Sequence, residues 1–259
     1  MQIKDLSGEM EKSVSVQIRI FKPDNTVEPG AATVITEHRV RIFLNDRLIL
    51  RLVCTPEHLK ELVIGRLLTD GYIDNIEEIS HLHICDSGHA ARVYLQQDAP
   101  VNITEQVAEE PTCCTNSQVI AAAAKRLQKL PAAKWEPRWI FALTKVFRED
   151  SKLHKSTFGT HSCYLAVEGK VLWGAEDIGR HNAMDKAIGY AALEGICPEQ
   201  CILFTTGRVP VDMVTKAVAA GVPVLVSKAV PTTEAVELAK EYGLTLICGA
   251  WPDQFGLFA

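Results

Sequence analysis

The sequence lacks the features that would place it in a membrane or in an oxidising compartment. No apolar run approaches the roughly 20 residues of a membrane-spanning helix. The first residues, MQIKDLSGEMEK, have neither the basic region nor the apolar region of a signal peptide. Eight cysteines are few for 259 residues, and their spacing shows no disulfide framework. We therefore expect a soluble cytoplasmic protein with reduced thiols and no membrane partner.

The chain also lacks a net positive charge and the ligand spacing of a zinc site. The formal net charge is −5, so no general basic field attracts nucleic acid. His81, His83 and Cys85 alternate along one predicted strand, but no second ligand pair accompanies them. No histidine is followed two residues later by a glutamate, as a zinc-dependent deaminase would require. We expect no nucleic-acid partner and no protein-bound zinc.

Hydrophobic residues make up 47% of the chain, which is ample for one large domain or two smaller ones. The stretches SVSVQIRIF and HRVRIFLNDRLILRLVC alternate as strands do, with a hairpin turn at Asn45-Asp46. A helix is predicted next, with Thr55 as its N-cap and Gly71 at its end. Two further strands follow, so residues 14–105 are predicted to form a small, strand-rich α/β roll domain.

The second predicted domain, residues 106–259, is α/β. A helix is expected over 117–130, while 134–158 shows no clear pattern. Glu168-Gly169 marks a hairpin turn, and a helix follows from about Ile178. Strands then alternate with helices, which implies parallel pairing with right-handed crossovers. The strands are expected at 201–208, 222–228 and 244–250, and the helices at 210–220 and from Thr232 or Thr233 to Gly243.

The carboxyl ends of these three strands are the expected ligand site, because parallel sheets bind ligands there. Gly207 would let a ligand approach the backbone, and Arg208 and Lys228 offer positive charge. Trp251 and Pro252 could flank a flat ring. The combination favours an anionic ligand with an aromatic base, such as a nucleotide. The alternative is that these are ordinary loop residues at the ends of strands and bind no ligand.

The stretch EDIGRHNAMDK is the densest polar cluster of the chain. On a helix that starts near Ile178, His181 and Asp185 are i, i+4 neighbours, and Asp177 can approach the first turn. A solvated helix face could carry such a mixture, but we interpret it as a binding surface. Its remaining members are Arg180, Asn182 and Lys186.

Two cysteines stand side by side in the polar stretch EEPTCCTNSQ. Cys113 and Cys114 precede the helix-capping residues Asn116 and Ser117, and the positive end of a helix dipole lowers the pKa of a thiol. A nucleophilic thiol of this kind can accept and deliver sulfur; a chance surface pair is the alternative. The cysteines in strand-like runs are expected to be buried core residues, namely Cys54, Cys85, Cys163, Cys201 and Cys248.

From about residue 37 to its end, the chain resembles the formate dehydrogenase accessory sulfurtransferase (FdhD/NarQ) family. The resemblance is carried by LKELVIGRLLTDGYI, by EDIGRHNAMDKAIG, by the Thr160-His161 element and by the stretch from TTGRVPVDM to TLICGA. It implies a cytidine-deaminase-like, three-layer α/β/α domain and a homodimer. It also implies a sulfur carrier that passes sulfur from a cysteine desulfurase to bis-molybdopterin guanine dinucleotide, before that cofactor enters formate dehydrogenase.

The resemblance further implies which residues act. Cys113 and Cys114 would be catalytic, and GDP would mimic the bound cofactor. Together, the strand ends, the polar cluster and the resembling stretches give the expected cofactor-binding residues, which are His161, Arg180, His181, Asp185, Lys186, Gly207, Arg208, Ser227, Gly249, Ala250, Trp251, Pro252, Asp253 and Gln254.

This chain departs from the family pattern in two places. Relatives usually carry Cys-Gly-x-Cys-Gly, whereas here Asn116 or Ser117 stands at the second cysteine. Relatives also tend to have Phe, Arg and Tyr where Gly249, Trp251 and Phe258 stand. The lost C-x-x-C motif gives the alternative function, a non-catalytic protein that binds the cofactor without moving sulfur.

Overall fold

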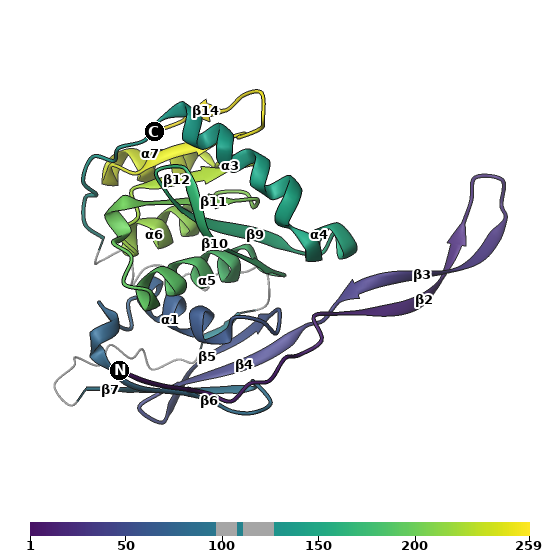
Figure 1. Ribbon diagram of the computed structural model, residues 1–259, viewed down its shortest axis with the longest axis horizontal. Coiled ribbons are helices and arrows are strands. Elements are labelled where there is room, and N and C mark those ends of the chain that lie inside the picture. Colours follow the sequence, from purple (N-terminus) through teal and green to yellow (C-terminus); the bar gives the residue numbers. More distant parts are fainter. Residues whose placement is uncertain (97–107, 111–126) are drawn as a thin grey trace.

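The computed structural model describes residues 1–96, 108–110 and 127–259. Two six-stranded sheets form the body, and helices α1 and α5 lie between them (Figure 1). A two-stranded arm projects from this body. The two helices pack directly against each other, so the contact between the sheets is a contact between helices.

The first sheet has the strand order β1-β6-β7-β4-β5-β8. The predicted turn at Asn45-Asp46 is confirmed, because both residues have positive φ between β4 and β5. The sheet extends past both predicted boundaries, 14 and 105, because β1 and β8 belong to it. Its strands are β1 (Gln2–Asp5), β4 (His38–Leu44), β5 (Arg47–Cys54), β6 (Ile79–Ile84), β7 (Ala90–Leu95) and β8 (Ala108–Glu110), with the short helix η1 (Ile76–Glu78) before β6.

Helix α1 (Leu59–Thr69) covers this sheet, and its start corrects the sequence prediction. Thr55 is not the N-cap, because its hydroxyl donates to the Asp177 carboxylate at 2.9 Å. The helix begins after His58, which has a left-handed φ of 57°. Gly71 follows the helix with a φ of 75°, which confirms it as the predicted end.

The second sheet has the order β10-β9-β11-β12-β13-β14. The pairs β11–β12 and β12–β13 are parallel, as predicted, and the remaining pairs are antiparallel. Glu168 and Gly169 have positive φ at the predicted hairpin turn. The strands are β9 (His161–Val167), β10 (Lys170–Asp177), β11 (Cys201–Thr205), β12 (Val224–Ser227), β13 (Thr245–Cys248) and β14 (Gly256–Leu257).

Helices cover both faces of the second sheet, in three layers. Residues of α5, α6 and α7 pack with Leu203 and Leu225 on one face, and Ile140 and Leu143 of α3 pack with Phe204 on the other. The finer assignment to a cytidine-deaminase-like fold stays a prediction. The helices are α3 (Pro137–Asp150), α4 (Lys152–Thr157), α5 (Arg180–Leu193), α6 (Val211–Ala219) and α7 (Thr233–Tyr242), with the short helix η2 (Pro198–Gln200) before β11.

The stretch between the sheets differs in part from the prediction. Most of the helix expected over 117–130 lies outside the described residues, but 127–130 are not helical. The segment 134–158, which shows no clear pattern in the sequence, contains α3 and α4.

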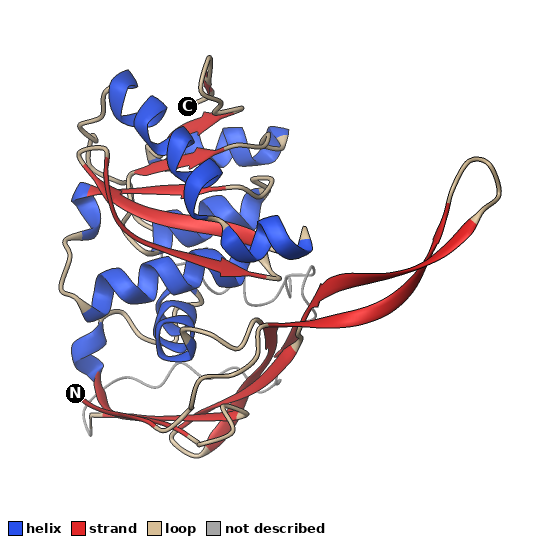
Figure 2. Cartoon of the chain, turned by 45° about the vertical axis from the view of Figure 1, so that its right-hand side comes forward, coloured by secondary structure: helices blue, strands red, loops and turns tan. Residues whose placement is uncertain are grey.

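The arm consists of β2 (Ser13–Phe21) and β3 (Val27–Ile35), paired antiparallel (Figure 2). Val14 opposes Val34, and Ile18 and Ile20 lie on the same face as this pair. These four side chains are exposed, so the described residues leave much of one apolar face of the arm uncovered.

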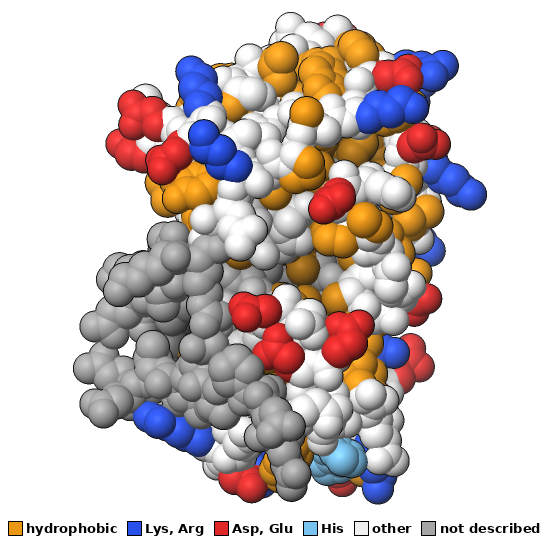
Figure 3. All heavy atoms as spheres, turned by 90° about the vertical axis from the view of Figure 1, so that its left-hand side faces the viewer, with side chains coloured by type: hydrophobic (Ala, Val, Ile, Leu, Met, Phe, Trp, Pro, Cys, Tyr) orange, Lys and Arg blue, Asp and Glu red, His pale blue; other side chains and the backbone are white. Residues whose placement is uncertain are grey.

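Figure 3 shows one face of the body, on which Lys and Arg side chains form separate groups rather than one basic stripe. No helix among the described residues is both long and apolar enough to cross a membrane.

Candidate functional site

Three loops meet at the carboxyl ends of β11, β12 and β13, as the parallel order requires. The amide of Lys228 donates to the carbonyl of Thr205 at 3.0 Å, which joins the ends of β11 and β12. The amide of Gly249 donates to the carbonyl of Ala229 at 2.9 Å, which joins the ends of β12 and β13. These bonds hold the three loops together at the edge where such sheets bind ligands. We call this edge the strand-end site.

Ser227 and Gly207 shape the strand-end site. The Ser227 side chain is fully buried, and its hydroxyl donates to the Gly207 carbonyl at 2.7 Å and accepts from the Ala229 amide at 3.0 Å. A Cβ atom on residue 207 would lie 2.8 Å from the Cβ of Arg180, so glycine permits the close approach of α5. The predicted contact between Ser227 and a ligand would need its present bonds to break.

Two guanidinium groups border this site. Arg208 is exposed, and none of the described residues forms a hydrogen bond or an ion pair with its side chain. Arg180 is half-buried, and its Nε is buried without a hydrogen-bond partner in the described parts of the chain. Positive groups without a carboxylate partner favour an anionic ligand.

The segment after β13 forms an exposed turn beside these groups. Gly249 turns the chain with a φ of 61°, a conformation that glycine adopts without strain. The Trp251 amide donates to the Gln254 carbonyl at 2.8 Å, and residues 251–254 are all exposed. Ala250 is buried, so only the turn itself is open to a ligand.

One aromatic neighbour of the strand-end site was missed in the sequence. The Nζ of Lys228 lies 4.3 Å from the ring centroid of Phe147 and 4.5 Å from that of Trp251. Phe147 belongs to α3, in the stretch without a clear pattern, so the sequence held no signal that would bring it here.

The polar cluster of α5 lies inside the protein. Lys186 and Asp177 are fully buried, with 2.7 Å between Nζ and Oδ2. Thr55 accepts from Lys186 at 2.8 Å and donates to Asp177 at 2.9 Å, which ties the end of β5 to the end of β10. The alternative of a solvated helix face is therefore wrong for these two residues, because their charges pair inside the protein at the junction between the sheets, and the predicted binding role of the cluster stays a prediction.

Asp185 belongs to a second buried group of charges. The Nζ of Lys216 lies 2.9 Å from Oδ1 of Asp185 and 3.3 Å from Oδ1 of Asp70, and the Nε of Arg66 lies 2.5 Å from Oδ2 of Asp70. Burial acts to raise the pKa of Asp70, but Arg66 and Lys216 outweigh it and hold that pKa below 3.8. A ligand would have to displace these partners to reach Asp185, and its predicted role in cofactor binding stays a prediction.

Two predicted histidines lie near Arg180. His181 lies 2.7 Å from Asp212 of α6, so it pairs there and not with its i, i+4 neighbour Asp185. Burial and then the charge of Arg180 lower the pKa of His161 from 6.5, so its imidazole is neutral at pH 7. A neutral imidazole beside a guanidinium can accept a proton from a reacting group.

Cys113 and Cys114 lie outside the described residues, so their predicted role stays a prediction. Cys54, Cys163, Cys201 and Cys248 are buried, as expected. Burial raises the pKa of Cys201 and of Cys248 to about 12, which keeps both thiols protonated.

Cys85 was expected to be buried but is more open, and Cys197, for which the sequence pattern predicts neither burial nor exposure, is exposed. Cys85 is half-buried, because it opens the turn after β6. Burial acts to raise its pKa, but the Ser87 hydroxyl and neighbouring backbone N–H groups outweigh burial and lower it. Cys197 is exposed in front of η2.

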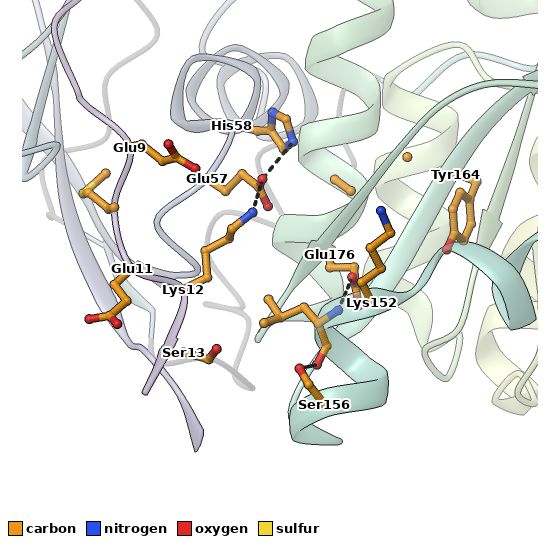
Figure 4. Close-up of a pocket in the computed structure, with 14 residues that line it drawn as sticks. Glu9, Glu11, Lys12, Ser13, Glu57, His58, Lys152, Ser156, Tyr164 and Glu176 are labelled. Atoms are coloured by element: carbon orange, nitrogen blue, oxygen red, sulfur yellow. Dashed lines mark hydrogen bonds and ion pairs between the residues drawn. The ribbon is translucent and has the colours of Figure 1, made fainter. Parts of the chain in front are cut away.

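A polar cavity of about 620 Å³ opens between the N-terminal segment, α4 and β10 (Figure 4). Lys12 and Glu57 pair across one side of it at 2.5 Å. On the other side, Glu176 accepts from the amides of Leu153 and His154 at the start of α4, at 2.9 and 2.7 Å. None of the predicted site residues that the structure describes lines this cavity, and its bonded carboxylates mainly hold the surrounding segments together.

No group of three or more His, Cys, Asp or Glu side chains is placed to hold a metal ion, as far as the structure describes the chain.

Comparison with known proteins decides the family. The family model described as FdhD/NarQ matches residues 35–259. The chain belongs to the FdhD/NarQ family. A member from Bacillus subtilis strain 168, named sulfur carrier protein FdhD, is 31% identical over 223 residues and is covered over 83% of each chain. A protein of the same name from Sulfurisphaera tokodaii is 31% identical over 252 residues, which are 93% of this chain and 96% of that relative.

A solved structure supports the fold along nearly the whole chain. It is a crystal structure described as that of a formate dehydrogenase accessory protein from Desulfotalea psychrophila. The TM-score is 0.78 at 27% sequence identity, with 96% of this chain and 97% of the other covered. The sequence and the architecture therefore both support the assignment to the FdhD/NarQ family.

Proposed function

We propose that this protein is a sulfur carrier that passes sulfur from a cysteine desulfurase to bis-molybdopterin guanine dinucleotide, for insertion into formate dehydrogenase in the cytoplasm. The observation that carries the proposal is membership of the FdhD/NarQ family together with relatives named sulfur carrier proteins over most of the chain. The uncompensated guanidinium groups at the strand-end site support an anionic, nucleotide-bearing acceptor.

The sulfur would travel as a persulfide on Cys113 or Cys114. The thiolate attacks the outer sulfur of the desulfurase persulfide, a new S–S bond forms, and the bond between the donor's two sulfurs breaks. The donor cysteine leaves as a thiolate, so this step needs no oxidant. Four of the other cysteines are buried core residues, which leaves few competing thiols.

Sulfur loading tests this proposal. After incubation with a cysteine desulfurase and cysteine, the wild type is expected to gain the mass of one sulfur atom, removable by a reductant. The double variant Cys113→Ala/Cys114→Ala is expected to lose this gain, because it lacks the proposed nucleophiles. Intact-protein mass spectrometry measures both.

The exposed thiol of Cys197 supplies the matched control. Cys197→Ala is expected to load sulfur as the wild type does. If the double variant loads as much sulfur as the wild type, the persulfide proposal is wrong. If the wild type takes up no sulfur yet binds guanine nucleotides, the alternative of a non-catalytic binding protein is favoured, which the altered C-x-x-C motif motivates.

Guanine nucleotides are expected to bind at the strand-end site through Arg208. Replacing Arg208 by alanine should weaken GDP binding by about 1.5–3 kcal/mol, because a charge-assisted hydrogen bond is lost. Arg208→Lys keeps the charge and should lose less. Isothermal titration calorimetry on the three proteins measures the difference, and equal affinity for GDP in all three would place the ligand elsewhere.

We also propose that the protein is a homodimer. Neighbouring exposed apolar side chains on one face are typical of contact surfaces, and a two-stranded ribbon is marginally stable without a neighbour. The uncovered face of the arm, with Val14, Ile18, Ile20 and Val34, supports such a contact. Sedimentation velocity at micromolar concentration decides between monomer and dimer.

A further inference from the structure

Lys228 is fixed in position by its backbone and by two aromatic rings. Its amide bonds to Thr205 at 3.0 Å, which holds the residue where β11 and β12 end. Its ammonium lies 4.3 Å from the ring centroid of Phe147 and 4.5 Å from that of Trp251. The rings come from α3 and from the segment after β13, so three separate parts of the chain direct this one side chain.

The ammonium of Lys228 has no anionic partner in the described parts of the chain. Burial lowers its pKa from 10.5, because the charged form has lost part of its water. The contacts of the ammonium with the two aromatic rings offset part of the hydration energy that burial removes. A partly dehydrated cation that is held in place, but not neutralised, is suited to an incoming anion.

The residues around the Lys228 ammonium indicate which class of anion would bind there. Trp251 is 44% exposed, so part of its indole is open to solvent beside the ammonium. Arg208 is exposed on the neighbouring loop, also without a partner among the residues described. Two cations near an open aromatic ring match a phosphate group that is linked to a planar base.

We infer that Lys228, held between Phe147 and Trp251, binds a phosphate group of the guanine nucleotide at the strand-end site. The inference rests on the proposed function, and it adds a residue and a geometry to it. Lys228 contacts the ligand, whereas Phe147 is a positioning residue that acts through Lys228. The aromatic clamp supplies the rigidity that a flexible lysine side chain lacks on its own.

The test compares GDP with guanosine, which lacks phosphate. In Lys228→Met, the affinity for GDP is expected to fall by about tenfold to a hundredfold, because a hydrogen bond to a charged group is lost. The affinity for guanosine is expected to stay within about threefold, since methionine still packs between the rings. Lys228→Arg keeps the charge and the ring contacts, and should stay within about tenfold of the wild type for GDP.

Controls separate the outcomes. Lys170 is exposed at the opposite end of the second sheet, so Lys170→Met removes the same charge without touching the site and should leave GDP affinity unchanged. If Lys228→Met binds GDP as the wild type does, or loses guanosine and GDP equally, Lys228 is no phosphate ligand and the inference is overturned. If the wild type binds no guanine nucleotide at all, the proposed ligand itself is wrong, and the inference with it.

Discussion

Replacing Gly65 or Gly189 by alanine is expected to lower the free energy of unfolding by at least about 3 kcal/mol, the upper end of the usual cost of overpacking. Helices α1 and α5 cross at these two glycines. A Cβ atom on residue 65 would lie 1.8 Å from the carbonyl oxygen of Asp185, and one on residue 189 would lie 1.9 Å from that of Glu61. Both obstacles are backbone atoms, so no side-chain rotation relieves the clash.

The helices would have to separate, and the buried charges on α5 would lose their partners on the first sheet and on α1. Chemical denaturation, followed by far-ultraviolet circular dichroism, measures the change in stability. Gly8→Ala is the control, because no atom lies within 4 Å of a Cβ placed there, and its effect should stay within about 0.5 kcal/mol. Wild-type stability of Gly65→Ala and Gly189→Ala would contradict this helix crossing.

The parallel strands of the second sheet and the helices between them were predicted well, because the sequence features that mark each element lie within it or next to it. Buried parallel strands are short apolar runs, and each of the following helices has its own start or end signal in the adjoining residues. Thr232 illustrates this: its hydroxyl accepts from the Ala235 amide at 3.3 Å, as an N-cap should. The strand-end site could therefore be assembled from the sequence, because parallel order brings the carboxyl ends of neighbouring strands together.

Contacts between distant parts of the chain were not predictable in this way. Thr55 looks like an N-cap, but its partner Asp177 lies 122 residues away. The polar residues of α5 look like a surface cluster, because nothing near them in the sequence reveals that the end of β5 and helix α1 cover them. Phe147 reaches Lys228 only through the packing of α3 on the second sheet. In each case, tertiary structure decides what the local pattern leaves open.

The buried charges between the sheets lead to the second large expected effect. Replacing Asp185 by asparagine should lower the free energy of unfolding by about 3–5 kcal/mol, because it leaves buried cations without a full counter-charge. Asp185 lies 2.9 Å from Lys216 and 3.6 Å from Arg66, and all three side chains are at most 4% exposed. Asparagine has nearly the same shape as aspartate, so the loss reports the charge and not a cavity.

The arm offers the matched control for this charge. Lys22 and Glu28 pair there at 2.6 Å, with 44% and 54% of their side chains exposed. Glu28→Gln makes the same carboxylate-to-amide change, but water solvates the remaining lysine, so the cost should be about 0–1 kcal/mol. Denaturant titrations of both variants, compared with the wild type, give the two values. Equal small losses would mean that Asp185 is hydrated in solution and that the charges between the sheets do not hold the two halves together.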